Sequence, residues 1–359
     1  MEFGVASLDC CIHWQRLFEG LPEKASSAFF SPMYYRSYTN VESVGIECFW
    51  AYQDESNFLF YPYLIKSVNA LGYDLDDQYF DVSGAYGYNG PLGVVEDQKF
   101  LSVYNSRLAE HFQQNNVVTE FVRYCPITNN RRLHSYTDQL DVLDNVYIDL
   151  SAGVDGVWQD SFEYRVRKTI RKGATYDLQT HILTGDEIKR SDLESFYQIY
   201  TSTMQRNDAD SFYFFDLDFF LSLHKNMGQM LVLALTYMEG KAITTELVLT
   251  SGKLAFAFLG GTLGEYYQYK ANTFQRWELV KYLCEHGFDI YSMGASIARG
   301  DSIYTFKKSF ARNCDNPFYI GTKVHLPTVY KQVCDQWKER YPGAAALHAN
   351  KVQGYRIQA

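Results

Sequence analysis

The feature that most constrains this chain is an order of structural elements that occurs twice along its 359 residues. In the first half, residues 44–51 and 58–65 are rich in apolar and aromatic residues, and the polar turn between them predicts a hairpin of half-buried strands. A loop rich in Gly, Tyr and Pro follows at 81–93 and is predicted to contain no regular element. Helical spacing over 97–115 and a strand pattern over 117–124 complete the order of hairpin, loop, helix and strand.

The second half repeats this order after additional helices. A strand is expected at 147–150, and the chain then shows helical patterns, the first with Ser161 as its N-cap, at 161–173, 193–205 and 215–225. The repeat itself consists of strands, a glycine-containing loop, a helix and a last strand, predicted at 230–238, 242–250, 253–259, 260–272, 277–286 and 289–293.

This order is typical of an N-acetyltransferase (GNAT-like) core. Its repetition predicts an α+β fold of two tandem GNAT-like subdomains, each with a mixed, splayed sheet flanked by helices. The predicted boundaries are 1–148 for the first subdomain and 149–325 for the second, the acyltransferase subdomain. Residues 326–359 are expected to form a helical tail that packs back on the first subdomain.

Composition agrees with a folded protein of this size. Hydrophobic residues make up 47% of the chain and charged residues 21%, which is a globular composition. The net charge of −9 argues against a general polyanion binder, so DNA is not an expected partner. Any phosphate or RNA site would have to be a local basic patch.

Several classes of protein are not expected. The sequence has no run of about 18 apolar residues and no secretion signal, so we expect a cytoplasmic protein without a transmembrane segment. The seven cysteines form no CxxC pair and the eight histidines are dispersed, which predicts neither a disulfide framework nor a metal site.

The most concentrated charge lies in the segment SFEYRVRKTIRK. On a helix, Arg165, Lys168 and Lys172 share one face. This patch is either a binding site for the phosphates of a nucleotide sugar, a pyrophosphate carrier or RNA, or a solvated helix face.

Two other segments carry candidate chemistry. Leu259, Gly260 and Gly261 follow a strand directly, so their backbone N–H groups are candidates for an acyl-donor or oxyanion site, with a plain turn as the alternative. The Gln/Arg-x-x-Gly-x-Gly/Ala pattern that holds coenzyme A pyrophosphate is absent here. In DSIYTFKKSF, an extended conformation would turn Lys307 toward a cleft and Lys308 toward the aromatic face, while the alternative is an edge strand with solvated lysines.

A series of short motifs resembles the Fem-type aminoacyltransferases. The motifs are YPYLIK, YGYNGP, EFVRYCP, YIDL, RKTIRK, TMQRNDADSFY, LGGT and FKKSF followed by PFYIGTK, and they span about residues 51–323. The resemblance implies two GNAT-like subdomains and transfer of an acyl group, usually an amino acid from aminoacyl-tRNA, onto an amine of a cell-wall precursor. It implies that Lys307 matches the family lysine that meets donor or substrate phosphates. The long charged helical hairpin of the larger members is absent, which leaves the mode of tRNA contact open.

The same resemblance suggests which residues bind substrate. Arg206 and Tyr213 match the motif beside the family's cleft, and Tyr86, Tyr88 and Arg123 lie in two further motifs that resemble the family. The alternative for the Arg206 segment is a helix-loop-helix corner in which Arg206 pairs with Asp208 or Asp210.

We therefore expect an acyltransferase that moves an aminoacyl or acetyl group onto an amine of a peptidoglycan or polysaccharide precursor, either a small molecule or lipid-linked. Lys307 and Glu246 are the two catalytic candidates. Glu246, within the strand ITTELVL, is a candidate to take the proton from the amine, directly or through water, and a strand carboxylate that faces solvent or a basic neighbour is its alternative. No cofactor is expected to be tightly bound; the donor would be aminoacyl-tRNA or acyl-CoA. The alternatives are a CoA-dependent N-acetyltransferase acting on a nucleotide-activated amino sugar, and a non-catalytic relative that binds a precursor or RNA.

Overall fold

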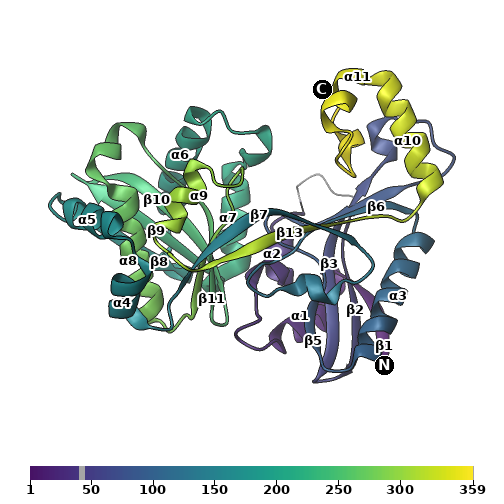
Figure 1. The fold of residues 1–359 in the computed structure, drawn as a ribbon, viewed down its shortest axis with the longest axis horizontal. Coiled ribbons are helices and arrows are strands. Elements are labelled where there is room, and N and C mark those ends of the chain that lie inside the picture. Colours follow the sequence, from purple (N-terminus) through teal and green to yellow (C-terminus); the bar gives the residue numbers. More distant parts are fainter. Residues whose placement is uncertain (40–44, 359) are drawn as a thin grey trace. The chain divides into compact units, whose positions relative to one another are not determined.

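The computed structural model describes residues 1–39 and 45–358 and divides the chain into two compact units (Figure 1). The first unit comprises Met1–Leu21, Phe29–Val142 and Phe318–Ala359, and the second comprises Pro22–Ala28 and Leu143–Pro317. Two long strands, β7 (Asp138–Asp149) and β13 (Asp315–Val324), carry the chain from one unit to the other.

The first unit contains a mixed sheet with the strand order β1-β2-β3-β4-β6-β13. Its pairs are antiparallel except β4 with β6, and β5 adds to β3. Helices α1, α2 and α3 belong to this unit, and α3 begins at the Asp97 cap, whose carboxylate accepts a hydrogen bond from Lys99 N. The bounds are β1 Glu2–Ser7, α1 Ile12–Glu19, α2 Pro32–Arg36, β2 Gly45–Asp54, β3 Asn57–Ser67, β4 Phe80–Ser83, β5 Leu92–Val95, α3 Gln98–Gln114 and β6 Val117–Arg123.

Aromatic side chains form the centre of this unit. Tyr61 and Tyr63 on β3 pack against Phe112 on α3, because alternate residues of a strand project to the same face. The C-terminal helices α10 (Pro327–Arg340) and α11 (Pro342–His348) pack on the same unit, where Val333 and Trp337 are buried with Val118 (Figure 1).

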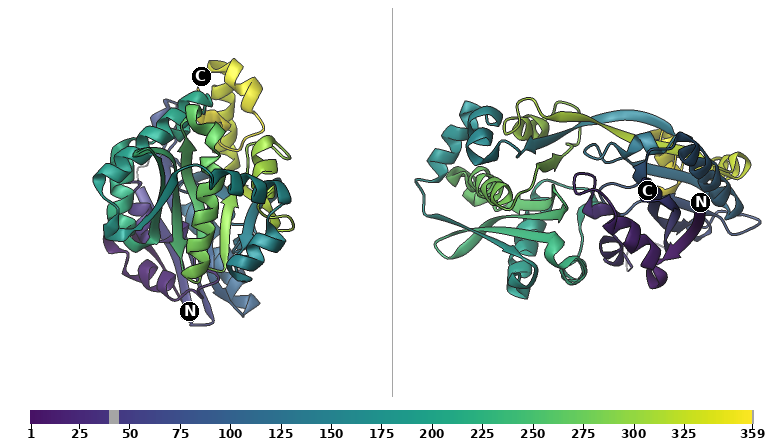
Figure 2. Two further views of the ribbon diagram at one scale, coloured as in Figure 1. Left: turned by 90° about the vertical axis from the view of Figure 1, so that its left-hand side faces the viewer. Right: turned by 90° about the horizontal axis from the view of Figure 1, so that it is seen from below.

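The second unit contains the sheet order β7-β12-β11-β10-β9-β8, in which only β11 and β12 are parallel. Helices of the second unit lie against its sheet (Figure 2). The apolar residues Val166 and Ile170 of α5 and Leu279 and Leu283 of α8 are buried in one cluster with residues of the sheet. The bounds are α4 Gly153–Gly156, α5 Tyr164–Gly173, β8 Leu178–Thr184, α6 Arg190–Arg206, α7 Leu217–Met227, β9 Leu231–Met238, β10 Lys241–Ser251, β11 Leu254–Thr262, α8 Ala271–Glu285, β12 Ile290–Gly294 and α9 Ser302–Lys308.

Most predicted elements are present, with three corrections. The segment 81–93 is not wholly irregular, because β4 ends and β5 begins inside it. Ser161 does not cap α5, which begins at Tyr164 after a π-helical turn. The segment 301–310 is not extended: Asp301 accepts a hydrogen bond from Tyr304 N at 2.7 Å and starts α9.

The sequence patterns also missed β1, β8 and β13. Position 44, the expected start of the first strand, lies outside the described residues. Nowhere in residues 1–39 or 45–358 does a helix have the length and apolar character needed to cross a membrane.

Candidate active site

A carboxylate, a guanidinium and a phenol meet inside the second unit. Glu246 lies in the middle of β10, Arg276 in α8 and Tyr291 in β12. Arg276 donates a hydrogen bond to Glu246 Oε2 at 2.9 Å, and the Tyr291 hydroxyl donates one to Glu246 Oε1 at 2.5 Å. Glu246 is 7% exposed and Arg276 9%, so this Glu246–Arg276–Tyr291 triad is withdrawn from water.

Burial and charge determine the protonation of the triad. Burial opposes the charge on Arg276, but Glu246 and Tyr291 together outweigh it and raise the pKa of the guanidinium. Burial and then Glu246 raise the pKa of the Tyr291 phenol, so Tyr291 remains a proton donor. Both carboxylate oxygens of Glu246 are thus occupied by partners from neighbouring elements.

Lys307 lies close to this triad. Its Nζ donates hydrogen bonds to the carbonyl oxygens of Ala295 at 2.7 Å and Gly294 at 3.4 Å, at the end of β12. Burial and then the charge of Arg276 lower the pKa of Lys307 to about 8, while Glu246 opposes this shift. An ammonium of this kind exchanges its proton near physiological pH.

Lys308 has a different environment. Its Nζ forms an ion pair with Asp315 at 2.9 Å, and Asp315 also accepts a hydrogen bond from Tyr304 at 2.7 Å. The two lysines diverge because consecutive residues of a helix are about 100° apart, not because side chains alternate along a strand. The expected extended geometry is wrong, although Lys307 is the lysine that lies near the triad.

The strands β11 and β12 separate next to this cluster. Within the described strands, the registered pairs end at Phe256 and Ser292, although β11 continues to Thr262. The register of β10 with β11 skips Phe258, which marks a β-bulge and places Gly260 opposite Glu246. The backbone of β11 beyond Phe256 therefore has an edge that does not pair with β12.

Close packing around β11 explains why glycines occupy positions 260 and 261. A Cβ on Gly261 would lie 2.3 Å from Thr203 Oγ1 on α6, and one on Gly260 would lie 2.5 Å from the Thr245 carbonyl oxygen. These glycines let the end of β11 approach α6 and β10 closely. They lie within a strand, not in the loop that the sequence predicted.

Arg206 and Tyr213 lie at and after the end of α6. The Arg206 guanidinium lies 5.0 Å from the centre of the Tyr267 ring and donates a hydrogen bond to its hydroxyl at 2.5 Å. Tyr213 ends a short 3₁₀ turn, and its carbonyl accepts a hydrogen bond from the Tyr200 hydroxyl. The exposed Phe212 packs edge-on against Tyr213, whereas the ring that lies against Arg206 is that of Tyr267.

The basic patch of α5, formed by Arg165, Lys168 and Lys172, is exposed. Arg165 forms an ion pair with Glu163 at 2.7 Å and donates a hydrogen bond to the Thr305 carbonyl at 3.4 Å. The neighbouring Arg167 has a structural role, since it donates hydrogen bonds to three carbonyls of the preceding turn, those of Trp158, Gln159 and Phe162.

Three sequence candidates belong to the first unit. Tyr86 accepts a hydrogen bond at its carbonyl from the Tyr34 hydroxyl at 2.5 Å, and Tyr88 packs edge-on against Phe318. Arg123 donates to the Gly87 carbonyl at 3.0 Å and lies 5.1 Å from the centre of the Phe318 ring. The structure therefore brings Tyr86, Tyr88 and Arg123 together in one corner of that unit.

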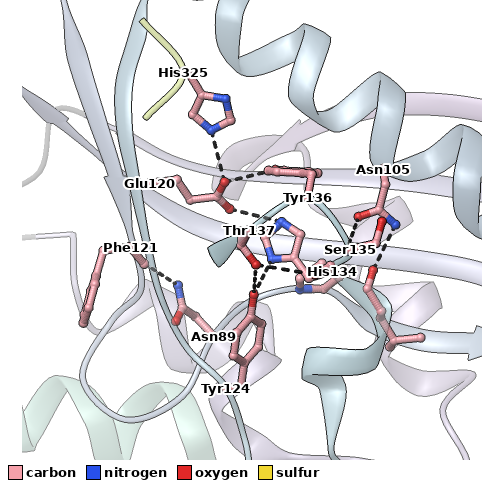
Figure 3. Close-up of polar contacts among 12 residues, drawn as sticks. Asn89, Asn105, Glu120, Phe121, Tyr124, His134, Ser135, Tyr136, Thr137 and His325 are labelled. Atoms are coloured by element: carbon pink, nitrogen blue, oxygen red, sulfur yellow. Dashed lines mark hydrogen bonds and ion pairs between the residues drawn. The ribbon is translucent and has the colours of Figure 1, made fainter. Parts of the chain in front are cut away.

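A second buried charge, not singled out from the sequence, lies in the first unit. Glu120 on β6 is fully buried and contacts His325 Nε2 at 3.1 Å, His134 Nε2 at 3.4 Å and the Tyr136 hydroxyl at 3.0 Å (Figure 3). His134 Nδ1 in turn lies 3.0 Å from the Tyr124 hydroxyl. A lone carboxylate within the apolar strand VVTEFVR is the signal that could have revealed this Glu120 cluster.

The pKa values of both Glu120 and His134 are lowered in the Glu120 cluster. Burial opposes ionisation of Glu120, but the two histidines outweigh it and lower the pKa of this carboxyl. Burial lowers the pKa of His134 to about 4, against the attraction of Glu120. Among the described residues, no group of three or more His, Cys, Asp or Glu is arranged to hold a metal ion.

Comparison with known families assigns the region that contains the triad. Residues 160–308 match the family model described as the acetyltransferase (GNAT) domain. These residues are a GNAT acetyltransferase domain. The GNAT domain contains the Glu246–Arg276–Tyr291 triad, Lys307, Arg206, Tyr213 and the α5 patch.

Solved structures extend the similarity over both units. The chain resembles the crystal structure of FemX with a TM-score of 0.63 and 13% identity, covering 90% of this chain and 96% of that one. It also resembles L-PGS from Bacillus licheniformis (TM-score 0.55, 14% identity, 89% and 95% covered). A third match is the C-terminal domain of a putative lysylphosphatidylglycerol synthetase from Agrobacterium fabrum (TM-score 0.52, 14% identity, 76% and 82% covered).

At these identities the likeness shows the fold, and it confirms the Fem- and GNAT-like fold that the sequence motifs predicted. A sequence comparison with curated proteins gave no match.

Proposed function

We propose that the chain is an acyltransferase that moves an aminoacyl or acetyl group onto an amine of a cell-envelope precursor, a peptidoglycan or polysaccharide intermediate. The observation that carries the proposal is the position of Lys307 within the GNAT domain. Its half-buried ammonium lies beside the triad, at the point where β11 and β12 separate. A fixed cation in a partly dry site is suited to stabilising the negative charge that develops during acyl transfer.

In the proposed reaction, the acceptor amine attacks the acyl carbon. The new C–N bond replaces the ester C–O bond of aminoacyl-tRNA or the thioester C–S bond of acyl-CoA, and the proton lost by the amine ends on the leaving oxygen or sulfur. Protonated Lys307 would stabilise the developing charge or supply a proton to the leaving group. Of the loop candidates Leu259, Gly260 and Gly261, the backbone N–H group of Gly260 would serve the oxyanion at the unpaired edge of β11. N–H groups alternate along a strand, and Leu263 N, three residues on, donates to the Ile243 carbonyl of β10 whereas Thr262 N does not.

Glu246 was a candidate proton acceptor in the sequence analysis, but we propose a different role for it. Its carboxylate oxygens are held by Arg276 and Tyr291. We therefore assign it to the charge balance of the site and not to direct proton transfer.

The remaining candidates would bind the two substrates. Arg206 and Tyr213 present a cation and rings of the type that grips phosphate and sugar groups. The α5 patch offers three positive charges to a phosphate-bearing donor or acceptor, including tRNA. Tyr86, Tyr88 and Arg123 form a similar combination in the first unit.

The proposal also covers the domain organisation. The first unit would be a second GNAT-like subdomain, with 1–148 and 149–325 as the two subdomains and 326–359 as the tail. A mixed sheet with one parallel pair occurs in both units, β4 with β6 and β11 with β12, and supports this view. Use of aminoacyl-tRNA or acyl-CoA would place the enzyme in the cytoplasm, where those donors are made.

The test is a donor comparison with the purified full chain. Acetyl-CoA and a mixture of aminoacyl-tRNAs are each offered with nucleotide-linked and lipid-linked muramyl-peptide precursors and with a nucleotide-activated amino sugar, and products are identified by mass. Aminoacyl transfer or acetyl transfer to a wall precursor supports the proposal. Acetylation of the nucleotide sugar alone would favour the CoA-dependent alternative, and tight precursor binding without any turnover would favour the non-catalytic one.

A further inference from the structure

Two charged side chains from other elements, a guanidinium and a carboxylate, lie near Lys307. Arg276 comes from α8, Glu246 from β10 and Lys307 from α9. Glu246 and Arg276 are buried, and they act with opposite charges on the half-buried Lys307. Charge interactions are strong in such surroundings, because the protein interior screens them weakly.

Arg276 also contacts the helix that bears Lys307. Its guanidinium lies 5.6 Å from the ring centres of both Phe306 and Phe310, which flank Lys307 along the chain. One NH group is bound to Glu246, and another lies 3.5 Å from Met293 Sδ. Arg276 is thus wedged between β10, β12 and the end of α9.

The other ionisable groups near Lys307 are few. Asp301, which caps α9, attracts its charge from the same helix. Tyr291 from β12 is neutral and donates a hydrogen bond to Glu246. Lys308 on α9 is neutralised by Asp315 of β13. Arg276 and Glu246 are therefore the charges from other elements that act on Lys307.

We propose that Arg276 and Glu246 are positioning residues that set the charge state of Lys307 from opposite directions. The role of Lys307 in acyl transfer rests on the proposed function, whereas the charge coupling itself does not. Without Arg276, the carboxylate of Glu246 would stand unbalanced and hold the Lys307 ammonium more strongly. Without the charge of Glu246, two cations would face each other and Lys307 would release its proton more readily.

A purely structural role predicts something different. Loss of a buried partner would lower stability for either residue, and any effect on Lys307 would have the same sign in both variants. Electrostatic coupling instead predicts that the pKa of Lys307 moves in opposite directions, because one variant removes a negative charge and the other removes a positive charge.

The experiment measures the titration of Lys307 directly in the full chain labelled with 13C at lysine Cε, with the Lys307 signal assigned from its absence in Lys307→Arg. We expect its pKa to fall by about one unit in Glu246→Gln and to rise by about one unit in Arg276→Met. Tyr291→Phe removes a hydrogen bond to Glu246 but no charge, so it is the matched control and should move the titration by less than about 0.3 units. Arg276→Lys retains the charge and should restore the wild-type value.

A second variant protects the test against misfolding of Glu246→Gln. Asp301→Asn keeps a side chain that caps α9 and removes a negative charge facing Lys307, so it should also lower the pKa of Lys307. The proposal would be overturned if the pKa of Lys307 moved in the same direction in Glu246→Gln and Arg276→Met, or if it moved in neither variant. If the titrations diverge as expected but no donor is turned over, the coupling stands and the proposed function fails.

Where turnover is found, the basic limb of the pH profile of kcat/KM should move with the nuclear magnetic resonance titration in each variant. A limb that stays in place while the Lys307 titration moves would show that the coupling exists but that Lys307 does not govern the reaction.

Discussion

Acid should destabilise the first unit through His134. This imidazole is fully buried, and its pKa is lowered from 6.5 to about 4 in the folded chain. The unfolded chain therefore takes up a proton that the folded chain does not, so stability falls as pH drops from 6.5 towards 4. A shift of this size corresponds to roughly 3 kcal/mol of unfolding free energy between pH 7 and pH 4.

Glu120 adds to the loss at the acid end of this range. Its pKa lies below the ordinary value of 4.5, so the stability it contributes is present above that pH and is lost as pH falls further. The decline above pH 5 therefore belongs to His134 together with His111 of α3, whose pKa burial also lowers.

The assay is hydrogen exchange of peptides from β6, which reports on the first unit alone, combined with urea unfolding at pH 7, 6 and 5 and constant ionic strength. His134→Gln should flatten the pH dependence, because glutamine retains a donor for Glu120 but does not titrate. His181→Gln, at an exposed site on β8, should leave the slope unchanged. Equal protection of β6 at pH 7 and pH 5 in the wild type, or an unaltered slope in His134→Gln, would refute the reasoning.

Three further outcomes are expected. Lys307→Ala should lower kcat/KM by at least about tenfold, or ~1.4 kcal/mol, whereas Lys308→Ala should cost much less in the same assay because Lys308 is engaged with Asp315. Replacing the three cations of the α5 patch by Gln should weaken precursor or RNA binding and flatten its salt dependence, with the urea midpoint nearly unchanged. Gly261→Ala should lower the unfolding free energy by roughly 1–3 kcal/mol, because its Cβ would lie 2.3 Å from Thr203 Oγ1. Gly343→Ala, with open space around the new methyl, is the control for that urea titration.

Local patterns in the sequence were sufficient for most helices and for the paired strands of each half. The spacing of apolar residues over 97–115 predicted α3, and the Gly-containing turn after Met238 separated β9 from β10. Both signals arise within one element, where backbone geometry alone sets the period. The order of these elements was then enough to predict the GNAT-like fold.

The same local reasoning failed at 301–310. The alternation of aromatic residues and lysines resembled a strand, but the Asp301 carboxylate accepts hydrogen bonds from backbone N–H groups and starts a helix. When the apolar spacing of a short segment fits both a helix and a strand, the capping residue and the packing partners determine which of the two forms. In the helical form that the structure shows, Lys307 reaches the carbonyls of Gly294 and Ala295.

The sequence by itself predicted most of the helices, the paired strands of each half and their order, showed the absence of long apolar runs and selected Lys307 as a candidate. Only the tertiary structure decided which charges meet. Glu246 finds Arg276 across 30 residues, and Glu120 finds His325 across 205. A buried charge must find a partner, but sequence spacing does not say which one, because the partner is chosen by the packing of elements far apart in the chain.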